Sequence, residues 1–355
     1  MRTPLLIAAL AAFTPHCPAA DTPIDLIAFG SCAHEERDQP IWETVVAERP
    51  DVFLFIGDNV YVDKPEPPRT AGDFADDYWE LLDKPGFQRL RRACPIHATW
   101  DDHDFGLNDA GREFPLKREA QLAMLSFFRE PADSPRWTRE GVYGAWDYGP
   151  AGKRVQIILL DTRTFRSPLR VNPLGRVRGK GPYLGHESPG PGGEPHTLLG
   201  EAQWGWLAQQ LARPADVRVI GSSIQVVAEE HGWEAWCNFP AERRRLYDLM
   251  TKTGAEGVVF LSGDRHQIEI SRAEDGGVPY PIVDFTSSGL NDPDGDPSEP
   301  NRYRVTPVLK TSNVGLVRID WDASPVAIEL EGVGLGGKRL VSHRVTLDEL
   351  RVSGE

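Results

Sequence analysis

Three aspartates and one histidine occupy four successive positions of the chain, from Asp101 to Asp104. Carboxylates this close repel one another unless cations offset their charge, so the cluster favours a metal site. The same negative charge raises the pKa of His103, and a protonated histidine can deliver a proton to a leaving alkoxide. Asn108, a few residues further on, is another candidate oxygen ligand. A solvated acidic turn is the alternative explanation for this cluster.

Two further acidic motifs directly follow apolar runs. Asp58 stands after the run from 52 to 56, and its carboxylate could bridge two ions because each oxygen can bind one cation. Asp264 and His266 follow the run from 257 to 261, and residues two apart on an extended loop can point into one site. The alternatives are an ordinary turn at Asp58, and a core histidine with an aspartate partner at His266.

Three cysteines lie beyond residue 20, namely Cys32, Cys94 and Cys237. An oxidising compartment favours pairing, yet three is an odd number, and a thiolate ligand at Cys32 would explain one unpaired thiol. A bridge between Cys94 and Cys237 stays open. Sulfur and nitrogen ligands favour a transition metal, whereas oxygen-only positions favour Ca²⁺ or Mg²⁺. For His34 we expect an outer or surface role.

The elements that must position these residues repeat one pattern, a short apolar run followed by a polar loop. Runs that are apolar throughout are typical of strands buried on both faces of an α/β sheet, where ligand sites lie beyond the carboxyl ends of the strands. We expect such strands at 24–29, 52–56, 94–100, 154–160, 217–220, 257–261 and 282–285. Helices are expected at 39–48, 200–211 and 242–251, and half-exposed antiparallel strands at 314–319, 326–330 and 339–345. The segment from 163 to 195, rich in glycine and proline, is predicted to be a long loop over the site, with disorder as the alternative.

Composition and the first residues set the class of protein. The 355-residue chain carries a formal net charge of −14, which argues against a general nucleic-acid binder. Residues 1–20 have a positive start, an apolar run and small residues before residue 21, so they are predicted to be a secretory signal peptide, and the protein to be exported, either periplasmic or secreted. No later segment reads as a membrane span. Residues 21–355 are predicted to form a single domain, and the oligomeric state is not indicated.

Taken together, these segments resemble the alkaline phosphatase D (PhoD-like) family of the calcineurin-like metallophosphoesterases. The matching pieces keep the family's order along most of the chain beyond residue 20. They are Phe29-Gly-Ser-Cys32, Pro50-Asp-Val-Phe-Leu-Phe-Ile-Gly-Asp-Asn-Val-Tyr61, Thr99-Trp-Asp-Asp-His-Asp104 with Asn108, Leu160-Asp-Thr-Arg163, Leu199-Gly-Glu-Ala-Gln-Trp204 and Leu261-Ser-Gly-Asp-Arg-His266. The resemblance implies an α/β sandwich of two mixed sheets flanked by helices. The extra amino-terminal domain of many family members is expected to be absent.

The resemblance also implies a set of site residues. His103 occupies the position of the catalytic histidine, and Asp58 that of the aspartate that bridges two ions. The implied metal ligands are Cys32, Asp58, Tyr61, Asp102, Asp264 and His266, with Asn108 as a further candidate. The implied ions are Fe³⁺ on the thiolate and phenolate side and Ca²⁺ nearby, and another divalent pair is an alternative. The exact roles of Asp101, Asn108 and Gln225 stay open.

The implied activity is metal-assisted hydrolysis of phosphate esters by a metal-activated water. His103 would protonate the leaving oxygen, and Asp104 or Asp101 would orient it. Arg163 could bind a phosphate oxygen or form a structural salt bridge, and Gln225 is a second candidate for substrate binding. Monoesters and diesters need the same apparatus, so both stay open. The alternatives are an exported metal-binding protein of the same fold without turnover, and a metal-dependent hydrolase of another ester.

Overall fold

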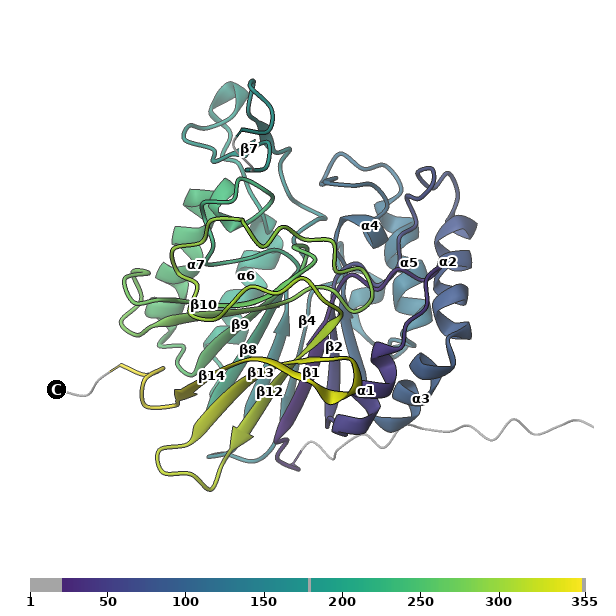
Figure 1. Ribbon diagram of the computed structural model, residues 1–355. Coiled ribbons are helices and arrows are strands. Elements are labelled where there is room, and N and C mark those ends of the chain that lie inside the picture. Colours follow the sequence, from purple (N-terminus) through teal and green to yellow (C-terminus); the bar gives the residue numbers. More distant parts are fainter. Residues whose placement is uncertain (1–20, 178–179, 353–355) are drawn as a thin grey trace, which may run out of the picture.

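The computed structural model describes residues 21–177 and 180–352 (Figure 1). The signal peptide predicted for residues 1–20 therefore lies outside the described residues. Within the described part of the chain, no helix is both long enough and apolar enough to cross a membrane.

Two six-stranded sheets form the centre of the molecule. The first has the order β14-β13-β12-β1-β2-β3, and β1, β2 and β3 run parallel. Its strands are β1 Leu26–Gly30, β2 Val52–Ile56, β3 Ile96–Thr99, β12 Asn313–Asp320, β13 Ala327–Gly334 and β14 Arg339–Thr346. The last three are antiparallel, as the alternating sequence predicted.

The second sheet has the order β10-β11-β9-β8-β5-β4. Its four central strands are parallel, and the edge strands β4 and β10 are antiparallel to their neighbours. The strands are β4 Gly144–Tyr148, β5 Val155–Leu159, β8 Val217–Ser222, β9 Val258–Ser262, β10 Ile268–Ala273 and β11 Ile282–Ser287. The sequence did not predict the two edge strands, because neither stands out as a continuous apolar run followed by a polar loop.

Helices cover the outer face of each sheet, on opposite sides of the molecule (Figure 1). The first sheet is covered by α1 Ile41–Glu48, α2 Ala71–Asp83, α3 Pro85–Ala93 and α5 Lys117–Phe127. The second is covered by α6 Gly200–Leu211 and α7 Pro240–Thr253. The short helix α4 Asp102–Phe105 lies at the end of β3, and the 3-10 turns are η1 Pro135–Trp137, η2 Pro191–Gly193, η3 Trp236–Asn238 and η4 Leu335–Gly337. The predicted α/β sandwich of two mixed sheets flanked by helices is confirmed.

The space between the sheets is filled by apolar side chains from both of them. All five residues of β2 are buried, and successive residues of a strand point to opposite faces, so the run serves two cores. Leu54 belongs to the core between the sheets, whereas Phe53 and Phe55 belong to the core beneath the helices. This double burial is why the central strands carry hardly any polar residue until they end.

The segment between β5 and α6 forms an excursion that stands above the rest of the molecule (Figure 1). Its only strands among the described residues are the short pair β6 Arg170–Val171 and β7 Tyr183–Leu184. The long loop predicted for 163–195 is therefore found, with this small antiparallel pair inside it. Cys94 and Cys237 are both free, so the disulfide between them that the sequence left open does not form.

We predict that Phe285→Ala will strongly destabilise the protein. Phe285 of β11 is fully buried and packs edge to face against Phe29 of β1, with ring centroids 5.0 Å apart. Removing a buried aromatic side chain leaves a cavity and costs about 3–5 kcal/mol. Urea denaturation would measure the loss, with the surface change Val305→Ala as control, expected within about 0.5 kcal/mol of the unmodified protein. Equal losses in the two variants would contradict this account of the core.

Candidate metal centre

The carboxyl ends of the parallel strands of both sheets meet on one side of the molecule. In the first sheet, Cys32 lies beyond β1, Asp58 beyond β2 and Asp101 beyond β3, and these strands are direct neighbours. In the second sheet, the loop beyond β9 carries Asp264 and His266. Because the two sheets pack face to face, loops that are far apart in the sequence converge here.

Three groups of potential ligand atoms lie together in this place. Within each group the ligand atoms are all within 4.8 Å of one another. Asp58 belongs to two of the groups, and so does Asp102, so each could serve two neighbouring cations. The groups are Cys32 with Asp58 and His266, Asp58 with Asp102 and His103, and Asp101 with Asp102 and Asp264.

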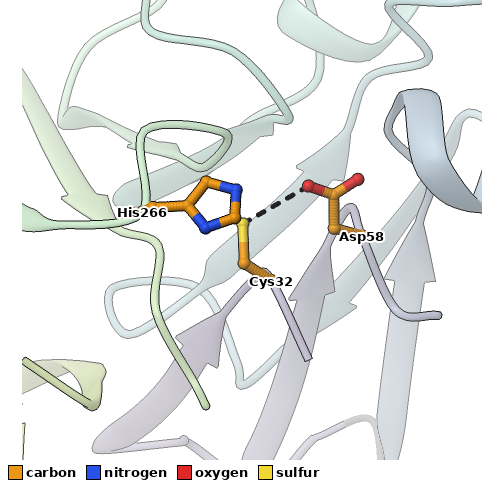
Figure 2. A group of neighbouring side chains, drawn as sticks. All are labelled: Cys32, Asp58 and His266. Atoms are coloured by element: carbon orange, nitrogen blue, oxygen red, sulfur yellow. Dashed lines mark hydrogen bonds between the residues drawn. The ribbon is translucent and has the colours of Figure 1, made fainter. Parts of the chain in front are cut away.

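The first group shows how the ligand atoms are directed (Figure 2). The Cys32 thiol donates to Asp58 Oδ2 at 3.3 Å. The His266 ring lies beside the sulfur, and its Nδ1 is 2.6 Å from the carbonyl oxygen of Asp292. A carbonyl can only accept, so Nδ1 carries a proton and Nε2 is the atom left to bind a cation. Ser288, which the sequence did not single out, has its hydroxyl 3.2 Å from the sulfur and accepts from the His266 amide at 2.8 Å.

Four of these residues have a left-handed backbone, which is uncommon for residues other than glycine. The φ angles are 59° for Cys32, 48° for Asp58, 66° for Asp264 and 52° for His266. Each such residue costs on the order of 1–3 kcal/mol, and it persists only where the surrounding structure determines it. The turns that begin directly at the strand ends thus direct these side chains into the site at the expense of stability.

Gly57 permits the close approach of the loops after β2 and β3. Its φ is 111°, and a Cβ at this position would lie 2.5 Å from the Cβ of Asp101. A side chain would therefore separate Asp58 from the acidic cluster, so the glycine in Gly57-Asp58 is required by packing as well as by backbone conformation.

Burial concentrates negative charge that the chain itself only partly offsets. The pKa of Asp58 is raised well above its ordinary value by burial first and then by Cys32 and Asp102. Burial and then the charge of Cys32 likewise raise the pKa of Tyr61 well above its usual range. A cation would reverse both shifts by favouring the carboxylate and the phenolate. The residues present therefore fit a metal centre, with sulfur, nitrogen and phenol ligands on one side and carboxylates on the other.

Cys32 and His266 offset each other's charge. Burial alone would raise the pKa of the Cys32 thiol, but the charge and hydrogen bond of His266 bring it down to about 7. Burial lowers the pKa of His266, but Cys32 outweighs this effect and raises it to about 10. This pairing favours the thiolate, which is the form of cysteine that binds metals.

The partner of His103 is a residue that the sequence analysis missed. Nδ1 of His103 lies 2.7 Å from Oδ1 of Asp63, and both side chains are buried. Burial lowers the pKa of His103, but Asp102 and Asp63 outweigh it and leave the pKa raised. The expectation that Asp104 or Asp101 orients the ring is therefore corrected. The available signal was an aspartate five residues after Asp58 in the same loop.

Asp104 and Asp101 have other partners. The Asp104 carboxylate accepts from the Asp101 amide at 2.6 Å, and this bond closes the first turn of α4. The Asp104 carboxylate also accepts from the Asn59 side chain. Asp101 Oδ1 accepts from Arg163 Nε and from the Ser223 hydroxyl, each at 2.6 Å, and Asp101 Oδ2 is buried without a hydrogen-bond partner. Asp101 is thus held firmly, with one oxygen left for a ligand.

Three predicted residues lie at the margin of the centre. Arg163 is fully buried and bonds both Asp101 and Glu234, so the structural salt bridge is the reading that its contacts support. Gln225 is buried and donates to Glu269 and Thr286. Asn108 is exposed, and its side-chain amide donates to Asp109 Oδ2 at 2.7 Å. Arg163 thus contacts a ligand group through Asp101. These hydrogen bonds of Gln225 and Asn108, by contrast, lie outside the three groups.

The sequence comparisons with known proteins agree on one family. The model of the PhoD-like phosphatase family matches residues 27–320. The alkaline phosphatase D of Bacillus subtilis (strain 168) is 25% identical over 287 residues, which cover 70% of this chain and 47% of that protein. The chain therefore spans about half the length of this curated relative.

Two solved structures share the fold. A structure of PhoD superimposes with a TM-score of 0.68 at 19% identity, covering 93% of this chain and 69% of the other. The purple acid phosphatase PPD1 from yellow lupin (Lupinus luteus) seeds superimposes with a TM-score of 0.61 at 11% identity, covering 93% and 55%. At these identities the structural likeness concerns the fold.

We predict that metal-free protein will lose stability as the pH rises from about 4 to about 7. Burial first of all raises the pKa of Asp104 to about 8 and that of Asp109 to about 7, from an ordinary value of 3.8. In this window the folded state holds protons that the unfolded chain has released, so the free energy of unfolding falls as pH rises. Urea denaturation of chelator-treated protein at both ends of the window would measure the change.

A divalent cation should restore more stability at the upper end of this window, because it offsets the negative charge that the released protons leave in the site. The matched control is the cation effect at the lower end, where the carboxylates are protonated. Chelated protein whose stability rises steadily from pH 4 to pH 7 would contradict the charge balance described for this site.

Proposed function

Because the chain belongs to the PhoD-like phosphatase family, we propose that it is a metal-dependent phosphoesterase acting on phosphate monoesters, diesters or both. One observation carries this proposal beyond family membership. Asp58 and Asp102 are each shared by two of the three ligand groups, so the strand ends offer adjoining cation positions rather than isolated ones. Adjoining cations are what phosphoryl hydrolysis uses to hold both the attacking and the leaving oxygen.

The ligand types suggest how two kinds of ion would divide the site. Cys32 and His266 supply sulfur and imidazole, and the family resemblance adds the phenol of Tyr61, which together suit Fe³⁺. Asp101, Asp102 and Asp264 supply oxygens, which suit Ca²⁺. Asp58 would be shared between them. The iron and calcium assignment comes from the family resemblance, and another divalent pair is the alternative. When bound, the ions would acidify a water molecule and stabilise charge on the phosphoryl oxygens.

His103 is the residue proposed to deliver the proton to the leaving oxygen. Its Nδ1 faces the Asp63 carboxylate, which can only accept when ionised, so Nε2 is the atom that can donate to substrate. Asp102 and Asp63 favour the protonated form, which is the form a general acid must hold before it acts. Asp63 would keep the ring in this orientation throughout the reaction.

We propose that Asp101 and Arg163 stabilise the geometry of the metal centre. Arg163 has its guanidinium bonded to Asp101 and Glu234, and none of these three side chains is more than 1% exposed. Burial of this guanidinium against two carboxylates favours a structural ion pair over substrate binding. We therefore propose that Arg163 fixes Asp101, whose second oxygen faces the cation position, and that it does not bind substrate.

The proposal includes the location and extent of the protein. The charged start and apolar run of residues 1–20 support an exported protein, periplasmic or secreted. Residues 21–355 are proposed to act as one domain, because the two sheets contribute to one site and share one core. The substrate within the class of phosphate esters is left to experiment.

We predict that removing calcium with a chelator will abolish hydrolysis of a chromogenic phosphate ester, and that adding calcium will restore it. The reason is that the carboxylates around Asp58 and Asp102 carry charge that the chain itself only partly offsets. Assays with a monoester and a diester, alongside elemental analysis of the purified protein, would measure the dependence. Full activity after exhaustive metal removal would refute the proposal, and metal-loaded protein without turnover on either ester would favour a binding protein instead.

We predict that His103→Ala will lower the rate by about 10²–10⁴-fold on an alkyl phosphate, the usual worth of a positioned proton donor. The loss should shrink on a nitrophenyl ester, because that leaving oxygen needs little protonation. Asp63→Asn should show the same dependence on the leaving group with a smaller loss, since it misorients the ring without removing it. Steady-state kinetics of each variant on both esters would measure these effects.

Metal content is the control for this series. Asp58→Ala should lose bound metal, whereas His103→Ala and Asp63→Asn should keep it. Loss of metal from His103→Ala would make this residue a ligand. An equal loss of rate on both esters, with metal retained, would show that His103 positions the phosphate and does not deliver the proton.

A further inference from the structure

The turn after α4 orients two carboxylates of the site with two successive backbone amides. The amide of Asn108 donates to Asp63 Oδ2 at 2.9 Å, and the other oxygen of Asp63 holds the His103 ring. The amide of Asp109 donates to Asp102 Oδ2 at 2.6 Å. The direction of both carboxylates therefore depends on the conformation of this one turn.

That conformation needs support from outside the turn. Asp109 has a φ of 56°, in the left-handed region that costs a residue with a side chain on the order of 1–3 kcal/mol. Its carboxylate accepts from the Tyr183 hydroxyl at 2.5 Å and from the Asn108 side chain at 2.7 Å, and its carbonyl accepts from Arg166. Tyr183 lies 74 residues further along the chain, in the excursion between β5 and α6.

Tyr183 is itself held in place through the main chain. Its amide donates to the carbonyl of Gly232 at 2.8 Å, and the amide of Gly181 donates to the carbonyl of His231 at 2.7 Å. These bonds join the excursion to the loop that follows β8. The Tyr183 hydroxyl is therefore a fixed contact, as a residue must be if it is to determine the geometry of its neighbours.

We propose that Tyr183 is a positioning residue of the phosphoesterase site. Through its hydrogen bond to Asp109 it holds the turn whose amides orient Asp63 and Asp102. Tyr183 acts through these residues and does not touch the substrate. This inference rests on the proposed function, since its effect is expressed through the proton donor His103.

The consequence concerns the leaving group. A donor that must deliver its proton along one direction loses efficiency when its orienting carboxylate shifts, and small displacements have large effects on such transfers. Esters with alkyl leaving groups depend on that proton, whereas nitrophenyl esters hardly do. The excursion thereby affects which phosphate esters are hydrolysed well, even without contact to them.

The test replaces Tyr183 by phenylalanine, which removes only the hydroxyl. Tyr183→Phe should lower kcat on an alkyl phosphate by about 5–10-fold, the worth of about one net hydrogen bond, with little change in KM. The loss on a nitrophenyl ester should be clearly smaller. Asp109→Ala should lower the rate at least as much as Tyr183→Phe, because it also removes the acceptor of the Asn108 side chain, and Asp109→Asn, which keeps an oxygen acceptor, should largely restore the rate. The double variant Tyr183→Phe with Asp109→Ala should be no worse than Asp109→Ala alone, since both substitutions break the Tyr183–Asp109 hydrogen bond.

Tyr280→Phe is the matched control for a merely structural role. The Tyr280 hydroxyl is buried and donates to the carbonyl of Ala255, which precedes β9 at the opposite end of the sheet from the site. This variant should lose stability to a similar degree without any dependence on the leaving group. A Tyr183→Phe protein whose rates on the two esters fall equally, or not at all, would overturn the proposal.

Amide hydrogen exchange gives a readout that does not require turnover. The amides of Asn108 and Asp109 should exchange faster in Tyr183→Phe than in the unmodified protein or in Tyr280→Phe. If the unmodified protein hydrolyses neither ester, the proposed function fails, and the exchange rates still decide whether Tyr183 holds the turn. Unchanged exchange at both amides would refute the positioning role, whatever the activity.

Discussion

Repulsion among buried carboxylates is the constraint on which this structure depends. Asp58, Asp101, Asp102 and Asp104 are all buried within two loops, and charges of one sign at this separation cannot all persist without compensation. The chain offsets some of them. Arg163 pairs with Asp101, and the Asp109 amide donates to Asp102. Among the described residues, Asp58 forms no ion pair with a lysine or arginine, and it belongs to two of the three ligand groups. The uncompensated charge thus sits where a cation would be shared.

Holding that charge in place requires a rigid support, and the two sheets supply it. Parallel strands bring their carboxyl ends to one edge, and the apolar core between the sheets keeps the two edges together. The turns at these edges have a strained backbone, because Cys32, Asp58 and Asp264 all have positive φ angles. A well-packed core can sustain several strained turns, which is why such strain collects at functional sites.

The fold is shared with proteins of low sequence identity, so the particular chemistry of this chain lies in its loops. The structural match to purple acid phosphatase PPD1 has 11% identity, which is enough to show a common architecture and no more. In this chain the excursion from β5 to α6 contacts the turn after α4 through Tyr183 and Asp109. Loops joined in this way can alter a site while the strands beneath it stay unchanged.

The sequence by itself determined where strands end and which residue types follow them. Apolar runs followed by polar loops predicted the central strands, and they placed Cys32, Asp58 and His266 beyond strand ends, where the structure brings them together. The sandwich of two sheets was implied by the family resemblance. These features are local, because a strand buried on both faces must be apolar and must stop at its first polar residues. The edge strands β4 and β10 lack this signal and were missed.

Only the tertiary structure decided which of these side chains meet. Asp63 rather than Asp104 reaches His103, Arg163 pairs with Asp101 and Glu234, Cys94 and Cys237 stay free, and Tyr183 reaches Asp109 from 74 residues away. In loops with left-handed residues the direction of a side chain no longer follows the alternation of a strand. It is set by packing between segments distant in sequence, and that packing exists only once both sheets are assembled.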